Sequence, residues 1–183
     1  IFDKNKVNNN GGAISNNGGS SIKGIEGTFT NNTASNSQGG AIYNNSANIG
    51  NITESLFDNN KSSWEGGAIF NSAASIGNIE GGFSNNSTSQ GQGGAIYNNG
   101  AKIGNITKSF FVNNKAKSNG GAIFNNNSTI KNIEGDFANN VTETGQGGAI
   151  FNNNATIENI TGSFDCNFAL NYGGGIWNDR TIG

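Results

Sequence analysis

The chain of 183 residues has no proline, no histidine and no methionine, and it has a single cysteine. Without histidine, a Ser-His-Asp triad is excluded and the commonest metal ligand is missing. Collagen is excluded because the triple helix needs proline and a glycine at every third position. Cys166 has no partner for an internal disulfide. Since no histidine can activate it, we expect Cys166 to be a small apolar filler rather than a nucleophile.

Charge and long hydrophobic runs are also scarce. Charged residues make up 12% of the chain, and 10 basic against 12 acidic side chains give a formal net charge of −2. We expect no nucleic-acid partner, because no basic stripe is present to neutralise phosphates. No apolar run approaches the roughly 18 residues of a membrane-spanning helix, so we expect this segment not to span a membrane.

Asparagine and glycine dominate what is present, with 38 and 30 residues respectively. Both residue types are unfavourable in helix interiors, which excludes a protein built from long helices. This composition by itself would be typical of a low-complexity chain. The asparagines and glycines recur at fixed positions, however, and this regularity predicts a periodic structure.

The repeat is 27 residues long. Gly-Gly-Ala-Ile occurs six times between Gly11–Ile14 and Gly147–Ile150, and Gly173–Ile176 is a variant of it. Two isoleucine columns keep the 27-residue step: Ile22, Ile49, Ile76, Ile103, Ile130 and Ile157, and then Ile25, Ile52, Ile79, Ile106, Ile133 and Ile160. A third apolar column is Phe2, Phe29, Leu56, Phe83, Phe110, Phe137 and Phe164. An asparagine follows each of its members by three residues: Asn5, Asn32, Asn59, Asn86, Asn113, Asn140 and Asn167.

A weaker period of 54 residues accompanies the 27-residue repeat. Ile-Glu-Gly occurs at 25–27, 79–81 and 133–135, whereas the repeats between them carry Ile-Thr. Two of the Ile-Thr repeats add a second aromatic residue, Phe57 and Phe111. This alternation suggests duplication of a unit of two repeats.

These columns predict an all-β fold, a right-handed parallel β-helix or β-solenoid of six to seven rungs, with residues 1–183 as a single domain. Rungs stacked about 4.8 Å apart place identical residues above one another, and only stacking gives them a continuous core. We expect that core to contain Phe29, Ile42, Ile49, Ile52 and their equivalents. Asparagine ladders would pair along the axis, and the Gly-Gly pairs would mark corners. We expect a right-handed coil because crossover connections between parallel strands are overwhelmingly right-handed.

Within a rung, we place strands at Ala41–Asn44, around Ile49–Thr53 and at Thr28–Asn31, with variable linkers such as Thr33–Gln38. Ile49 and Ile52 are three residues apart, which breaks the alternation of a regular strand. A bend at residues 50 and 51 would let both side chains point inward.

The candidate contact site is an aromatic column that directly follows the isoleucine of each Gly-Gly-Ala-Ile: Tyr43, Phe70, Tyr97, Phe124 and Phe151. If the isoleucines are buried, the alternation of a strand points these rings outward. A line of exposed rings would be an apolar stripe able to contact a glycan, another chain or a covering segment. The alternatives are that the rings stack on one another and stabilise the face, or that they belong to the core.

We predict no catalytic residue, no metal ligand and no cofactor. Glycoside hydrolysis needs two carboxylates about 5 to 9.5 Å apart, but Glu26, Glu80 and Glu134 share a column only at every second rung, about 10 Å apart. The acidic residues do not cluster as a calcium site requires. We therefore expect a protein that is not an enzyme, and a polysaccharide-acting enzyme is the weakest alternative.

The alternation of Phe-x-x-Asn with Gly-Gly-Ala-Ile resembles the polymorphic outer-membrane protein repeats of chlamydiae and related autotransporter passenger repeats. It stands at Phe29–Asn32 with Gly39–Ile42, at Phe83–Asn86 with Gly93–Ile96, and at Phe137–Asn140 with Gly147–Ile150. The resemblance covers essentially the whole chain. It implies a right-handed parallel β-helix passenger that is exported to the cell surface and acts in adhesion, with a host-cell receptor or glycan as its partner.

The two ends of the chain bear on its context. The chain stops near the next position of the Ile22 column, at Ile182, and neither end has the polar cap that a soluble solenoid needs. We expect a fragment of a longer repeat protein; the alternative is self-association of uncapped ends into a surface filament. The function we expect is that of a non-enzymatic extracellular structural or adhesin passenger segment of a bacterial surface protein, associated with the outer membrane.

Overall fold

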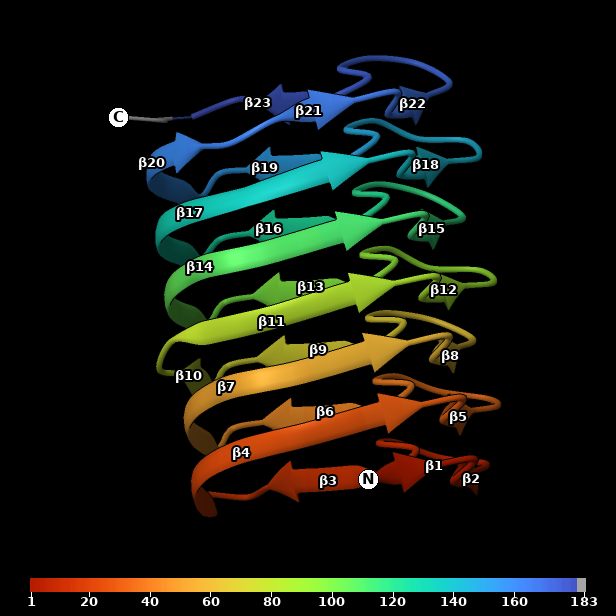
Figure 1. Ribbon diagram of the computed structural model, residues 1–183, viewed down its shortest axis with the longest axis vertical. Coiled ribbons are helices and arrows are strands. Elements are labelled where there is room, and N and C mark those ends of the chain that lie inside the picture. Colours follow the sequence, from red (N-terminus) through yellow and green to blue (C-terminus); the bar gives the residue numbers. More distant parts are fainter. Residues whose placement is uncertain (181–183) are drawn as a thin grey trace.

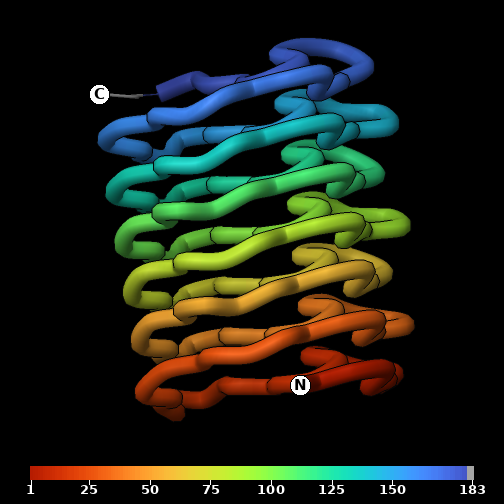
Figure 2. The backbone as a smooth tube through the Cα atoms, viewed as in Figure 1, coloured from red at the N-terminus to blue at the C-terminus, as the bar shows by residue number. Residues whose placement is uncertain are grey.

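The computed structural model describes residues 1–180, which form an all-β parallel solenoid of about seven rungs. In Figure 1 the long front strands run from left to right, and the strands behind them return while the chain climbs from red to blue. The coil is therefore right-handed, as predicted. Successive rungs follow nearly the same path (Figure 2). Ile182 lies outside the described residues.

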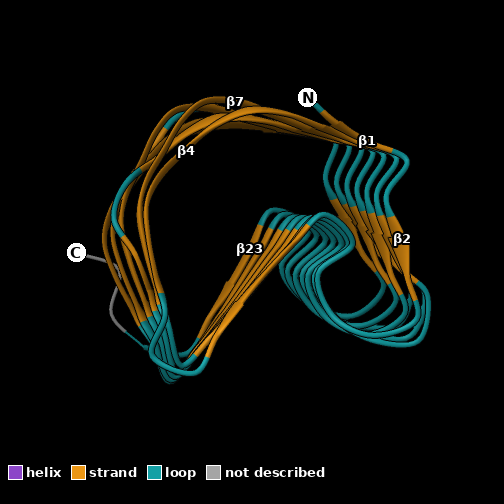
Figure 3. Ribbon diagram, turned by 90° about the horizontal axis from the view of Figure 1, so that it is seen from below, coloured by secondary structure: helices purple, strands orange, loops and turns teal. Residues whose placement is uncertain are grey.

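Three parallel sheets form the sides of the solenoid (Figure 3). Sheet A contains β1 (Phe2–Asp3), β4 (Ser21–Thr30), β7 (Asn48–Asp58), β10 (Ser75–Ile76), β11 (Ile79–Ser84), β14 (Lys102–Val112), β17 (Thr129–Ala138), β20 (Thr156–Thr161) and β21 (Phe164–Asp165). Sheet B contains β2 (Lys6–Val7), β5 (Thr33–Ala34), β8 (Lys61–Ser62), β12 (Ser87–Thr88), β15 (Lys115–Ala116), β18 (Val141–Thr142) and β22 (Phe168–Ala169). Sheet C contains β3 (Ile14–Asn17), β6 (Ile42–Asn45), β9 (Ile69–Ser72), β13 (Ile96–Asn99), β16 (Ile123–Asn126), β19 (Ile150–Asn153) and β23 (Ile176–Asn178).

The strand predictions are confirmed for sheets A and C and incomplete for sheet B. The two strands expected around Ile49–Thr53 and at Thr28–Asn31 are parts of the same long strands, such as β4 and β7. Ile49 and Ile52 are both buried, as the expected bend requires. Sheet B lies in what we expected to be linker, because its strands are only two residues long and leave no periodic signal.

The core consists of the predicted columns, with one correction. Ile42, Ile49, Ile52 and Phe29 and most of their equivalents are buried. In two rungs the expected core positions Leu56 and Phe110 are wrong: they point outward and are 37% and 43% exposed. The next residues in the chain, Phe57 and Phe111, are fully buried and stack between the phenylalanines of adjacent rungs with ring centroids 4.7–4.8 Å apart.

A β-bulge causes this exchange. The bulged rungs have one extra residue in sheet A, and the pairing of β4 with β7 shifts register between Glu26 and Thr28. A shift of one residue exchanges the two faces of a strand. At the bulge, Glu54 has a φ of 47°. The hydroxyl of the buried Ser55 accepts a hydrogen bond from the Gly27 amide at 3.2 Å and donates one to a backbone carbonyl, so it satisfies the interrupted ladder.

The asparagine ladder at the turn between sheets A and B shifts with the bulge. Asn60 and Asn114 take the places predicted for Asn59 and Asn113, and the ladder reads Asn5, Asn32, Asn60, Asn86, Asn114, Asn140 and Asn167. Its steps alternate between 28 and 26 residues over the bulged rungs. The linker after each bulge is one residue shorter, which restores the 27-residue spacing and hides the bulge in the sequence.

A second asparagine ladder lies inside sheet C. Each side-chain Nδ2 donates to the Oδ1 of the next rung at 2.7–2.8 Å, through Asn16, Asn44, Asn71, Asn98, Asn125, Asn152 and Asn178. The Gly-Gly corners precede this sheet. Gly39 has a φ of 65°, and a Cβ on Gly40 would lie 2.0 Å from the carbonyl oxygen of Gly67 in the next rung. The corners therefore need glycine both for backbone conformation and for close stacking.

Candidate interaction surface

The five residues of the predicted contact stripe lie in one column on sheet C. Tyr43 lies between the fully buried Ile42 and Asn44 in β6, so its ring is on the face of the sheet opposite the core. The rings of the column stack with centroids 4.9–5.2 Å apart and nearly parallel planes, and Trp177 continues the stack at 4.4 Å. Stacking of the rings, which we considered as the alternative, is what the structure shows.

The column is much less exposed than a line of free rings would be. The three phenylalanines are only 5–6% exposed, and the two tyrosines are half-buried. The loops from sheet B to sheet C curve back beside this face (Figure 3). Burial, together with the charge of Glu65, raises the pKa of Tyr97 to about 12, and burial also raises the pKa of Tyr43. A contact role for this column stays a prediction. Tyr43 and Tyr97 are best placed for such a role because they are its more exposed members.

The bulges create a second surface, on sheet A, that the sequence columns did not reveal. Leu56 and Phe110 project outward two rungs apart, and Gly82 lies between them in the same column. A Cβ on Gly82 would lie 2.1 Å from Cζ of Phe110, so the ring lies over this glycine. The adjacent pairs Leu56-Phe57 and Phe110-Phe111 were the available signal, because only one member of each pair can face the core.

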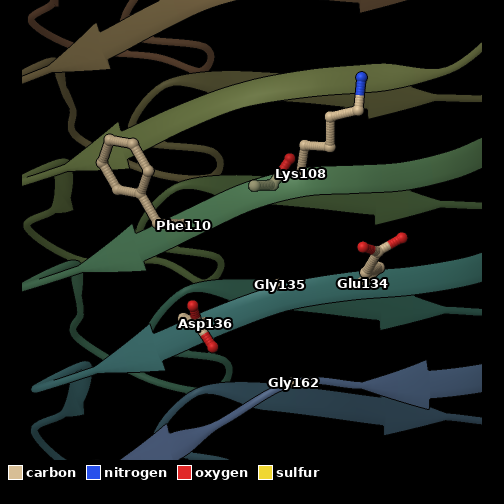
Figure 4. Close-up of a pocket in the computed structure, with 7 residues that line it drawn as sticks. Lys108, Phe110, Glu134, Gly135, Asp136 and Gly162 are labelled. Carbon is tan, nitrogen blue, oxygen red and sulfur yellow. The ribbon is translucent and has the colours of Figure 1, made fainter.

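A shallow open depression of about 380 Å³ adjoins the Phe110 ring. Its lining comes from β14, β17 and the residues just after β20: Lys108, Ser109, Phe110, Glu134, Gly135, Asp136 and Gly162. Figure 4 shows the Phe110 ring presenting a flat face, with the side chains of Glu134 and Asp136 on either side of Gly135. Gly135 and Gly162 need to be glycine because a Cβ on either would lie against a backbone carbonyl of the neighbouring rung, 2.6 Å from the carbonyl oxygen of Ser109 and 1.9 Å from that of Gly135 respectively.

Acidic groups dominate the charge of this depression. The Oδ1 atom of Asp136 accepts hydrogen bonds from the backbone amide of Ser163 at 3.0 Å and from its hydroxyl at 2.5 Å, which lowers the pKa of the Asp136 carboxyl. The Nζ atom of Lys108 forms an ion pair with Glu80 at 3.0 Å. The Lys108 charge is thus compensated by a carboxylate that is not part of the lining.

Two further predictions concern metal ligands and Cys166. Within residues 1–180, no group of three or more His, Cys, Asp or Glu side chains is close enough to hold a metal ion. Cys166 is exposed with a φ of 51°, so our expectation of a buried filler is wrong. It occupies the left-handed turn position that Asn31 and Asn85 hold in other rungs. A hydrogen bond to Asp165, with that residue's charge, raises the pKa of the thiol and disfavours the reactive thiolate.

Fold and surface together define a class: a right-handed parallel β-solenoid built from one repeated rung, with stacked aromatic and asparagine ladders. The Chlamydia polymorphic membrane protein repeat is the family whose model matches residues 1–17, 26–48, 54–72, 83–99 and 108–126. These matches cover just over half of the chain, and the chain belongs to this repeat family, which confirms the resemblance seen in the motifs. No curated protein and no solved structure matches the chain.

Membership of this family carries a general implication for location. Proteins of the family are associated with the outer membrane, which suggests a passenger-like segment of a surface protein. In the part of the chain that the structure describes, no helix is long and apolar enough to cross a membrane.

Proposed function

We propose that the chain is a non-enzymatic structural and adhesive segment of a bacterial surface protein and that it is displayed outside the cell. The uninterrupted stacking of the core rings, from Phe2 to Phe164 at 4.6–4.8 Å, supports this proposal most directly. Such stacking makes a rod roughly 30 Å long, at about 4.8 Å per rung, that holds outward side chains at a fixed spacing. A rod of this kind can present a binding face without a catalytic cavity.

One pair of carboxyl groups bears on the question of catalysis. Glu134 and Asp136 lie two residues apart on the outer face of β17, so their spacing alone would permit a hydrolytic pair. Hydrolysis also needs a general acid, whose pKa is raised so that it holds a proton near neutral pH. The hydrogen bonds from Ser163 lower the pKa of Asp136, so this carboxyl is unsuited to be that acid.

Adhesion can be tested with the isolated chain. Beads coated with the 183-residue chain should adhere to host epithelial cells in larger numbers than beads coated with an unrelated β-solenoid of similar charge. Equal adhesion of the two kinds of bead would contradict the adhesive role. Release of reducing or unsaturated ends from any member of a broad polysaccharide panel would contradict the non-enzymatic role.

The aromatic column needs a variant of its own. Tyr43 stacks on only one ring of the column, Phe70, so Tyr43→Ser is the least disruptive change there. If the column contacts a partner, this variant should lose bead adhesion while its melting temperature stays within a few degrees of the parent's. Unchanged adhesion would leave the column with a stabilising role alone.

A further inference from the structure

The outer face of sheet A carries a flat aromatic surface that the core does not need. Phe110 is 43% exposed, and one face of its ring lies over Gly82, so the ring is held flat against the sheet. Leu56 extends the apolar surface on the other side of Gly82, which gives a platform two rungs long, or about 10 Å. Because the glycine holds the ring in place, a ligand that stacks on Phe110 loses little side-chain entropy on binding.

Hydrogen-bonding groups adjoin this platform. In Figure 4 the Phe110 ring leans away from β17, over the rung that holds Gly82, while Glu134 and Asp136 project from β17 on the other side of β14. Asp136 pairs in register with Phe110, and both carboxylates are exposed. The Ser163 amide and hydroxyl occupy Oδ1 of Asp136 and fix the orientation of this carboxylate. Carboxylates accept strong hydrogen bonds from hydroxyl and ammonium groups. Gly135 and Gly162 also line the depression.

We propose that the depression beside Phe110 is a binding site for a neutral or amino-sugar oligosaccharide, an assignment that rests on the proposed adhesive function and names its ligand class. One face of a pyranose ring carries C–H groups. Their weakly positive hydrogens pack on the negative face of an aromatic ring. Hydroxyl or ammonium groups of this sugar or of the next sugar residue in the chain would then donate to Asp136 and Glu134 on β17. A volume of about 380 Å³ is suited to one or two sugar residues rather than to a folded domain.

The charges and the size of the site decide between ligand classes. Sulfated or carboxylated sugars are disfavoured because they would face two carboxylates, while Lys108 is already paired with Glu80. A protein partner is disfavoured because stable interfaces bury about 800 Å² per partner. Within residues 1–180, Leu56 and Phe110 are the large apolar side chains that the strands of sheet A expose.

The test is calorimetric titration of the 183-residue chain with hexamers of N-acetylglucosamine, glucosamine and β-1,4-glucose, and with a sulfated heparin fragment. At least one neutral or amino-sugar hexamer should bind, and the heparin fragment should not. Phe110→Ala should weaken binding at least tenfold, Phe110→Tyr should retain it, and Glu134→Gln with Asp136→Asn should weaken it. The matched control is Phe168→Ala, since Phe168 is exposed on sheet B and its loss should leave binding unchanged.

Circular dichroism and melting temperature establish that each variant is folded. Binding of the heparin fragment alone, binding of no hexamer at millimolar concentration, or equal binding by Phe110→Ala and the parent would overturn the assignment. Cell adhesion that depends on Phe110 but survives removal of surface glycans would also overturn it, in favour of a protein partner. If beads adhere but no sugar binds, this inference fails alone; if sugars bind but beads do not adhere, the adhesive role fails.

Discussion

Asn86→Ala tests the turn ladder at its centre. Asn86 is fully buried, and its Oδ1 accepts from both the backbone amide and the side-chain amide of Asn60 at 3.0 Å. Its Nδ2 donates to the Phe57 carbonyl at 2.9 Å and to Asn114 at 3.0 Å. Removal of the side chain leaves two buried donors and one buried carbonyl short of a partner. At about 1–3 kcal/mol for each unsatisfied group, and with partial relaxation, we expect a loss of about 3–5 kcal/mol.

Urea unfolding followed by far-ultraviolet circular dichroism measures this loss as the shift in midpoint multiplied by the slope. The matched control is Asn105→Ala, because Asn105 belongs to a half-exposed ladder with Asn78 and Asn132 in which water replaces the lost bonds. The control should cost less than about 1 kcal/mol. A loss at Asn86 no larger than that at Asn105 would refute the claim that buried amide ladders hold the rungs together.

Three further results are expected. Phe57→Ala should cost about 3–5 kcal/mol of unfolding free energy, whereas Leu56→Ala should cost under about 1, because only Phe57 is in the core. A larger loss for Leu56→Ala than for Phe57→Ala in urea unfolding would contradict the bulge. The Nζ atoms of Lys115 and Lys117 form ion pairs with the Glu143 carboxylate at 2.6 and 2.7 Å, and their hydrogen bonds lower its pKa from 4.5 to about 2. The melting-temperature advantage of the parent over Glu143→Gln should therefore be full near neutral pH and fall away as pH drops from 4.5 to about 2; a pH-independent difference would exclude these ion pairs. In an ultraviolet titration, Tyr97→Phe should remove a phenolate step near pH 12, and loss of a step near pH 10 instead would show that Tyr97 is not buried as described.

The fold follows from the sequence to an unusual extent because stacking repeats every local interaction. Strict columns of isoleucine predict the core without knowledge of long-range contacts, since each residue packs on its own equivalent one rung away. The same regularity misled the assignment at Leu56 and Phe110. An insertion in sheet A and a deletion in the following linker cancel in the 27-residue count, so spacing alone could not place the faces of those strands.

The candidate surfaces were less predictable for a related reason. The outward direction of the Tyr43 column follows from strand alternation, but its low exposure depends on ring stacking and on how the loops fold back. The outward position of Phe110 beside the depression depends on a bulge and on Gly82 beneath the ring. The bulge does leave a trace in the second aromatic residue at Phe57 and Phe111, but the 27-residue columns do not show which member of each pair faces outward.

The stacking of one rung per repeat is tested most directly by the distance between two spin labels in one exposed column. Asn51 and Asn159 are exposed, and Asn78, Asn105 and Asn132 lie between them, so four rungs separate the two positions. With Cys166→Ser as background, cysteines at 51 and 159 carry the labels. At about 4.8 Å per rung, double electron–electron resonance should give a narrow distribution of label-to-label distances near 19 Å, apart from the length of the label arms. A broad distribution centred beyond twice that distance would contradict the solenoid.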